Sequence, residues 1–212
     1  MKARLLLLGA IVSLTGCAIR SNGPLEWTDS DYDYNFSMVG IPYLLGGFGT
    51  AVPIDENLSI TAKHVAKYSF DSVVAYHEHC DIAIVERDNS DLSIPKWGSA
   101  SFGDNIQNVG WGLTFQEVSG YGEYRTNVNL TNEEYKNCFI AVTDAPLQTG
   151  MSGGGAYNEK GELIGVNFMI ADELFDENGE PYQYERYSFF VSMEQIKDWV
   201  NAEVKSYNQK ND

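Results

Sequence analysis

The chain has 212 residues, of which 43% are hydrophobic and 20 are glycine, enough for one large β domain or two small lobes with a buried core. Its formal net charge of −16 repels phosphate backbones and anionic lipid surfaces. The composition therefore predicts a globular protein and excludes nucleic acid as a favourable partner.

The first residues of the chain are typical of a targeting signal. A basic region with Lys2 and Arg4 precedes an apolar run at 5–14, which is too short to remain as a membrane-spanning helix. The next residues, Leu14-Thr15-Gly16-Cys17, resemble the lipobox of bacterial lipoproteins. The resemblance implies a lipoprotein signal peptide over 1–16 and acylation of Cys17, palmitate included. The expected location is the bacterial envelope, at the outer rather than the inner membrane, facing the periplasm or the surface. An ordinary signal peptide with a chance cysteine is the alternative.

Residues 17–37 are acidic and tyrosine-rich and have no hydrophobic period, which predicts a tether that holds the domain off the membrane. Two further cysteines, Cys80 and Cys138, could pair in an oxidising compartment. Both lie in apolar surroundings, where a free thiol behaves as a small hydrophobic group. We therefore expect buried free thiols and leave a disulfide as the alternative.

From residue 38 onward, short β-like runs alternate with turn residues. Many short strands of this kind predict an all-β antiparallel sandwich or barrel, with lobes at about 38–92 and 93–190. A single helix is expected at 192–207, where Ser192 and Gln195 have the spacing of a capping box and apolar residues repeat on one face.

A serine held among glycines is the most informative feature of the sequence. Ser152 lies in the glycine-rich stretch 149–155, between apolar runs at 138–142 and 162–168 that predict buried strands. Glycine can turn several N–H groups toward one point, which is the geometry of an oxyanion hole beside a nucleophile. An incidental serine in a hairpin loop is the alternative.

A nucleophilic serine needs a base, and the base needs an acid. His64 follows the predicted strand at 58–62, and Asp81 leads into an apolar strand, where a buried carboxylate requires a partner. His77 and His79 share one side of a strand, but the neighbouring residues offer no third and fourth metal ligands. We expect neither a metal nor an organic cofactor.

Three segments carry the candidate site: Thr61-Ala62-Lys63-His64, Asp81-Ile82-Ala83-Ile84 and Thr143 to Gly154. Together they resemble the catalytic blocks of chymotrypsin-fold (trypsin-like) serine proteases, most closely the bacterial high-temperature-requirement branch. The order His, Asp, Ser along the chain differs from the orders in subtilisin-like enzymes and α/β-hydrolases. The resemblance covers the chain from about Phe48 to the final helix and implies two antiparallel six-stranded β-barrels over 38–212.

The resemblance also implies a role for each site residue. Ser152 becomes the nucleophile, His64 the general base and Asp81 the group that orients the base. The backbone N–H groups of Gly150 and Ser152 would form the oxyanion hole. His64 and Asp81 lie closer in sequence than is usual, so Asp71 is the reserve candidate for the acid.

Two departures from the family concern regulation. Met151 stands where chymotrypsin and its relatives carry an Asp that pairs with a newly released N-terminus, so no such activation switch is expected. No PDZ-like segment follows the predicted barrels, so we expect none of the partner-driven allostery of larger relatives.

The resemblance also implies where the substrate pocket lies. Counted back from Ser152 without gaps, the position that forms the pocket floor in chymotrypsin-like proteases falls at uncharged Pro146, and Val166 and Phe168 would narrow an apolar wall. Small or medium aliphatic P1 residues are therefore expected, unless a register shift brings Asp144 to the floor and favours basic ones.

The sequence as a whole predicts a lipid-anchored serine endopeptidase that acts on polypeptides through an acyl-enzyme. A peptide-binding pseudoprotease and a purely structural lipoprotein are the alternatives. The oligomeric state is left open.

Overall fold

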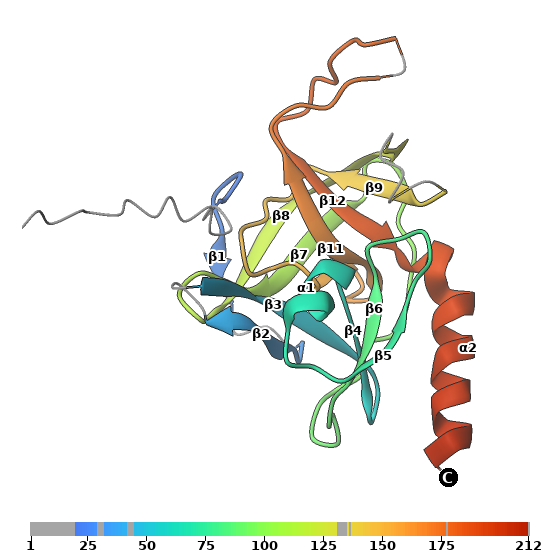
Figure 1. Cartoon of the computed structure of the whole chain (residues 1–212). Helices are drawn as coiled ribbons and strands as arrows, with labels where there is room; N and C mark the ends of the chain where they lie inside the picture. Colours follow the sequence, from blue (N-terminus) through green and yellow to red (C-terminus); the bar gives the residue numbers. More distant parts are fainter. Residues whose placement is uncertain are drawn as a thin grey trace, which may run out of the picture.

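The computed structural model describes residues 20–28, 32–41, 45–130, 135, 137–176 and 178–211. The predicted signal peptide over 1–16 and the predicted acylation site Cys17 lie outside these residues. Two antiparallel sheets form the body, the short helix α1 lies beside the first of them, and the long helix α2 runs along one flank (Figure 1).

The N-terminal sheet contains five strands in the order β2-β3-β4-β6-β5. In the part of the chain that the structure describes, β2 and β5 do not pair, so hydrogen bonds do not close this sheet. The prediction of a six-stranded barrel is therefore not met for this lobe. The bounds are β2 (Asn35–Ile41), β3 (Leu45–Asp55), β4 (Leu58–Thr61), α1 (Lys63–Tyr68), β5 (Val73–Tyr76) and β6 (Ala83–Glu86).

The C-terminal sheet closes into the predicted six-stranded barrel. Its order is β1-β8-β7-β10-β11-β12-β9, and β9 pairs again with β8, while the two-residue β1 adds to the edge of β8. The bounds are β1 (Glu26–Trp27), β7 (Asn105–Trp111), β8 (Glu117–Asn129), β9 (Phe139–Thr143), β10 (Gly155–Asn158), β11 (Leu163–Ala171) and β12 (Tyr187–Ser192). The connection from β11 to β12 projects from the barrel at the top of Figure 1.

One core joins the two sheets. Ile60 and Ile84 from the first sheet and Val166 and Phe189 from the second are at most 1% exposed and belong to one cluster of buried side chains. Burying apolar surface between the sheets drives their association, so the cleft between the lobes has rigid walls.

The C-terminal helix α2 spans Met193–Asn211, so it begins one residue later and ends four residues later than predicted. Ile196 and Val200 are fully buried on its inner face. The Ser192 hydroxyl accepts a hydrogen bond from the N–H of Glu194 at 3.2 Å, as a cap does. Gln195 does not complete a capping box, because its side-chain oxygen accepts instead from the N–H of Phe139 at 3.0 Å.

The prediction of a tether over 17–37 is wrong for the residues that the structure describes. Tyr34 is 7% exposed, and the ring of Tyr32 stacks on that of Tyr157 with centroids 4.0 Å apart. Glu26 and Trp27 pair with β8, and β2 already begins at Asn35. An acidic segment without a hydrophobic period can still pack against the protein when a few of its aromatic rings contact other rings.

The prediction of free thiols is also wrong. Cys80 and Cys138 form a disulfide with their Cα atoms 5.3 Å apart, and both residues are fully buried. Their apolar surroundings correctly indicated burial, but sequence context carries no information about the distance between residues separated by 58 positions. The bridge joins the loop before β6 to the start of β9, and so ties the first lobe to the second.

Candidate active site

The loop that carries Ser152 connects β9 to β10 and begins with a tight turn. The N–H of Met151 donates to the carbonyl of Gln148 at 3.1 Å, and Gly150, the third residue of this turn, has a φ of +102°. A turn with positive φ at its third residue favours glycine. A Cβ atom at Gly150 would also lie 2.2 Å from the ring of Phe48.

Hydrogen bonds fix the Ser152 loop to both lobes. The carbonyl of Ser152 accepts from the N–H of Thr50 on β3 at 2.8 Å, and the N–H of Gly153 donates to the carbonyl of Asn167 on β11 at 2.7 Å. Gly153 has a φ of +86°, and a Cβ there would lie 2.0 Å from the carbonyl oxygen of Thr50. The serine therefore stands at the seam between the lobes.

His64 and Asp81 form a pair beside this seam. His64 lies in the first turn of α1, directly after β4, and its Nδ1 lies 2.6 Å from Oδ2 of Asp81. The N–H of His64 donates to the other carboxylate oxygen at 2.9 Å. The Asp81 side chain is 3% exposed, whereas that of His64 is 46% exposed. One histidine thus satisfies both oxygens of a buried carboxylate, which fixes the imidazole with Nε2 directed away from Asp81.

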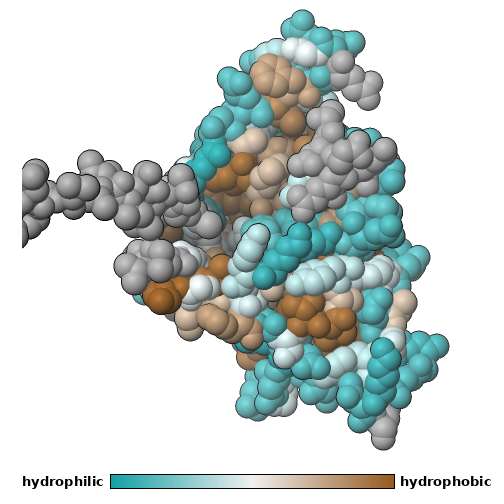
Figure 2. All heavy atoms as spheres, viewed as in Figure 1, coloured by the Kyte–Doolittle hydropathy of each residue, from teal (hydrophilic) through white to brown (hydrophobic). Residues whose placement is uncertain are grey.

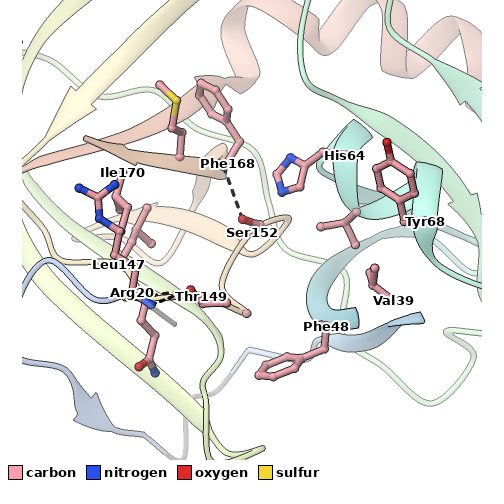
Figure 3. A pocket seen from close by; sticks show the side chains of 15 residues that line it. Arg20, Val39, Phe48, His64, Tyr68, Leu147, Thr149, Ser152, Phe168 and Ile170 are labelled. Atoms are coloured by element: carbon pink, nitrogen blue, oxygen red, sulfur yellow. Dashed lines mark hydrogen bonds between the residues drawn. The ribbon is translucent and has the colours of Figure 1, made fainter. Parts of the chain in front are cut away.

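Ser152 lies across the cleft from His64 (Figure 3). Its hydroxyl donates to the carbonyl oxygen of Phe168 at 3.4 Å, and no hydrogen bond joins it to His64 among the residues that the structure describes. A bond of this length is weak, and catalytic hydrogen bonds are often long or absent before substrate binds. A change of the serine rotamer changes the direction of its hydroxyl without moving the backbone.

The backbone N–H groups of Gly150 and Ser152 find no acceptor within the described part of the chain. The carbonyl of Gly150 is directed inward, where it accepts from the Thr50 hydroxyl at 2.9 Å. Two unused N–H donors beside a serine can bind an oxyanion.

The chain matches the family model of the trypsin-like peptidase domain over residues 61–166. This range contains His64, Asp81 and Ser152. The chain belongs to this family. The predicted resemblance to chymotrypsin-fold (trypsin-like) serine proteases is thereby confirmed.

Relatives of this peptidase domain include a probable serine protease do-like of Buchnera aphidicola, 29% identical over 143 residues. The match covers 58% of the chain and 30% of the relative, so the chain spans less than a third of that protein. Among solved structures, the HtrA-type protease AlgW with a decapeptide matches with a TM-score of 0.62 and 18% identity over 81% of this chain and 63% of that one. The serine endoprotease from Yersinia pestis matches with a TM-score of 0.60 and 17% identity over 80% and 62%. The structural matches support the fold.

The cleft of this peptidase domain has a volume of about 380 Å³ and is lined by His64, Ser152 and a largely apolar wall. On the face shown in Figure 2, apolar side chains gather in a hollow below the projecting β11–β12 connection. The residues near Ser152 that form the wall are Leu147, Phe168, Met169 and Ile170, and Phe48, Val65 and Tyr68 lie on the opposite side. Arg20, from the N-terminal segment, also lines the cleft.

Two of the predicted pocket residues do not line this cleft. Pro146 is buried against Gly120 of β8: a Cβ atom added at Gly120 would lie 2.1 Å from the carbonyl oxygen of Pro146. Its neighbour Leu147 lines the cleft instead. Val166 is fully buried in the core. Phe168 does line the cleft, since the pairing of β11 with β12 is irregular between Asn167 and Met169 and this changes the direction of the side chain.

The two other candidate acids have structural partners. Asp144 forms an ion pair with Arg125 and accepts from the N–H of Glu123 at 2.7 Å, so no register shift brings it to the cleft. Asp71, whose side chain is 5% exposed, pairs with Arg87. Neither carboxylate contacts His64.

His77 and His79 do not form a metal site with a third ligand among the described residues. His77 Nδ1 accepts from the N–H of Cys80 at 3.0 Å, and its ring packs edge-on against Trp199 with centroids 4.9 Å apart. Desolvation, followed by the nearby charge of Lys63, lowers the pKa of His77.

No pattern in the sequence indicated the contribution of Arg20, Asn22 and Thr50. The first two lie in the segment without a hydrophobic period, and Thr50 lies in a strand where its hydroxyl carries no motif. Their roles depend on contacts with residues about 100 or more positions away, such as the bond from Thr50 to Gly150.

Proposed function

We propose that the protein is a serine endopeptidase in which Ser152 is the nucleophile, His64 the general base and Asp81 the group that orients the base. The observation that carries this proposal is the His64–Asp81 pair, with its 2.6 Å contact, facing a serine whose loop has two unused N–H donors. A buried carboxylate that binds Nδ1 of an exposed imidazole leaves Nε2 to accept a proton.

In the proposed reaction, the Ser152 hydroxyl leaves the Phe168 carbonyl and turns to His64 Nε2. The serine oxygen attacks the peptide carbonyl while Nε2 takes its proton, and the N–H groups of Gly150 and Ser152 bind the oxyanion. The imidazolium, stabilised by Asp81, then protonates the leaving amine. Water, deprotonated by His64, cleaves the ester and returns the serine.

The polypeptide substrate would bind along β11. This strand pairs with β10 only up to Val166, and its later residues pair on one side with β12. Residues 168–170 lie in the cleft wall beside Ser152, so an extended peptide can add to the edge that does not face β12 as a further strand.

The wall of Leu147, Phe168 and Ile170 supports the predicted preference for small or medium aliphatic P1 residues. A basic P1 side chain would be buried in this wall without a carboxylate, and Arg20 would add like-charge repulsion. We therefore propose that the enzyme does not prefer to cleave after arginine or lysine.

We further propose that the chain is processed after Gly16, that Cys17 carries a lipid, and that the enzyme acts in the bacterial envelope, at the outer membrane. A second relative from Buchnera aphidicola, 29% identical over 143 residues and named a probable periplasmic serine endoprotease DegP-like, supports an envelope location. None of the helices in the described ranges is long and apolar enough to cross a membrane.

Labelling with a fluorophosphonate probe tests the activity, since the probe reacts with an activated serine. We expect labelling of the wild type and none of Ser152→Ala or His64→Ala. Ser90→Ala, at an exposed serine that bonds Asp88, should be labelled like the wild type. The alternative is a pseudoprotease, favoured by the absence of a Ser152–His64 hydrogen bond between the described residues. An unlabelled wild type that still binds peptides would support it.

A further inference from the structure

We propose that the segment Arg20–Leu25, here called the N-terminal strap, positions the oxyanion loop, residues 147–152, and so sets the turnover of the active site. The proposal rests on the proposed function, because it assigns a role to the Gly150 and Ser152 donors. The strap comes from the far end of the sequence, and it contacts the residues that lead into Gly150.

The strap pairs with the loop through backbone and side-chain hydrogen bonds. The N–H of Thr149 donates to the carbonyl of Arg20 at 2.8 Å, and the N–H of Arg20 donates to the Thr149 hydroxyl at 3.0 Å. The N–H of Asn22 donates to the carbonyl of Leu147 at 3.1 Å, and the Asn22 side-chain oxygen accepts from the N–H of Leu147 at 2.8 Å.

Between these two pairs, Ser21 forms an antiparallel bridge with Gln148. Each of the three residues directly before Gly150 thus pairs with the strap.

The strap is itself fixed to the barrel. The side-chain nitrogen of Asn22 donates to the Ser188 hydroxyl on β12 at 2.9 Å. Gly23 lies so close to its neighbours that a Cβ there would be 2.9 Å from Cβ of Pro146. Leu25 packs against the buried cluster that contains Met151, and the next two residues pair with β8. The strap therefore fixes the oxyanion loop at a defined position relative to the barrel.

The loop needs this support because glycine gives it other conformations. Gly150 can change its φ and ψ without a steric penalty of its own, and such a change would turn the N–H of Gly150 or Ser152 away from the cleft. On the inner side, two hydrogen bonds hold the loop. The Thr50 hydroxyl donates to the carbonyl of Gly150, and the N–H of Met151 donates to the carbonyl of Gln148. The strap holds it from the outside.

Substitution at Asn22 tests the strap in the full-length protein. Asn22→Ala removes all three side-chain hydrogen bonds, those to Leu147, Tyr187 and Ser188, whereas Asn22→Asp keeps the acceptor for the N–H of Leu147. We expect Asn22→Ala to lower kcat by at least tenfold with KM within about twofold, because a misplaced oxyanion donor acts in the transition state. Asn22→Asp should recover most of the loss. Asn105→Ala, which removes an exposed side-chain contact with Glu159, is the matched control and should behave like the wild type.

Amide hydrogen exchange over residues 147–152 gives a second readout that does not need activity. Amides of the loop should exchange faster in Asn22→Ala than in the wild type, and exchange over β7 and β8 should be unchanged. Wild-type kcat in Asn22→Ala, an equal loss in Asn22→Asp, or unchanged exchange over the loop would each overturn the proposal. Failure of the serine endopeptidase itself would show differently, as a wild type that the fluorophosphonate does not label while the exchange measurement still decides the role of the strap.

Discussion

Asp81→Asn is the substitution that tests the proposed triad most directly. Asp81 accepts two hydrogen bonds from His64, one from Nδ1 at 2.6 Å and one from the backbone N–H at 2.9 Å. An asparagine can keep its oxygen on the backbone N–H, but its NH₂ group then faces Nδ1. The imidazole must then accept a hydrogen bond at Nδ1 and carry its own proton on Nε2. Nε2 is the nitrogen that should receive the proton of the serine.

The expected cost is about 10⁴ in kcat, equivalent to roughly 5 kcal/mol of transition-state stabilisation. The assay is steady-state cleavage of a peptide with an aliphatic P1 residue, together with a thermal melt to confirm folding. Asp71→Asn is the control. It leaves Arg87 without its buried partner and should cost about 3 kcal/mol of folding stability with little change in kcat of the folded enzyme. A larger loss of kcat in Asp71→Asn than in Asp81→Asn would refute the assignment of the acid.

Three further perturbations test the disulfide, His77 and the proposed lipid anchor. Replacing both Cys80 and Cys138 by alanine should lower the free energy of unfolding by roughly 4 kcal/mol, because the bridge closes a long loop, and a denaturant titration that shows no loss would contradict this. His77 has a lowered pKa in the folded state, so the unfolded chain binds its proton more readily. The stability from neutral His77 is present above about pH 6.5 and is lost as the pH falls through the lower folded pKa, and His77→Gln should flatten this part of the melting-temperature profile. Cys17→Ser should release the protein from the membrane pellet into the soluble fraction or leave it unprocessed, whereas unchanged detergent-dependent fractionation would argue against the anchor.

The sequence predicted the strands beside the nucleophile well. Apolar runs at 138–142 and 162–168 correspond to β9 at Phe139–Thr143 and β11 at Leu163–Ala171. Such runs indicate that a strand is buried, but they do not say which strand pairs with it. Closure of the C-terminal barrel depends on β8 pairing with β9, and the open N-terminal sheet lacks an equivalent pairing between β2 and β5 in the described residues. Barrel closure therefore could not be derived from the local pattern.

The lining of the cleft differs from the counted pocket for a related reason. Side chains along an extended segment alternate between faces, so an error of one position exchanges buried and cleft-lining residues. Counting placed the floor at Pro146, and the cleft is lined by Leu147 instead. Phe168 reaches the cleft through an irregularity in strand pairing, which no period in the sequence marks.

The N-terminal strap shows most clearly what a hydrophobic pattern omits. A segment that binds through backbone N–H and carbonyl groups needs no apolar period, because every residue type except proline carries both groups. Arg20 and Asn22 pair with Thr149 and Leu147 in this way, and Leu25 supplies one apolar contact. Polarity predicted a tether, whereas the partners of these backbone groups lie more than 120 residues away. The same property explains why side-chain substitution alone, apart from Asn22, is a weak probe of the strap: only Asn22 contributes its side chain to both the oxyanion loop and β12.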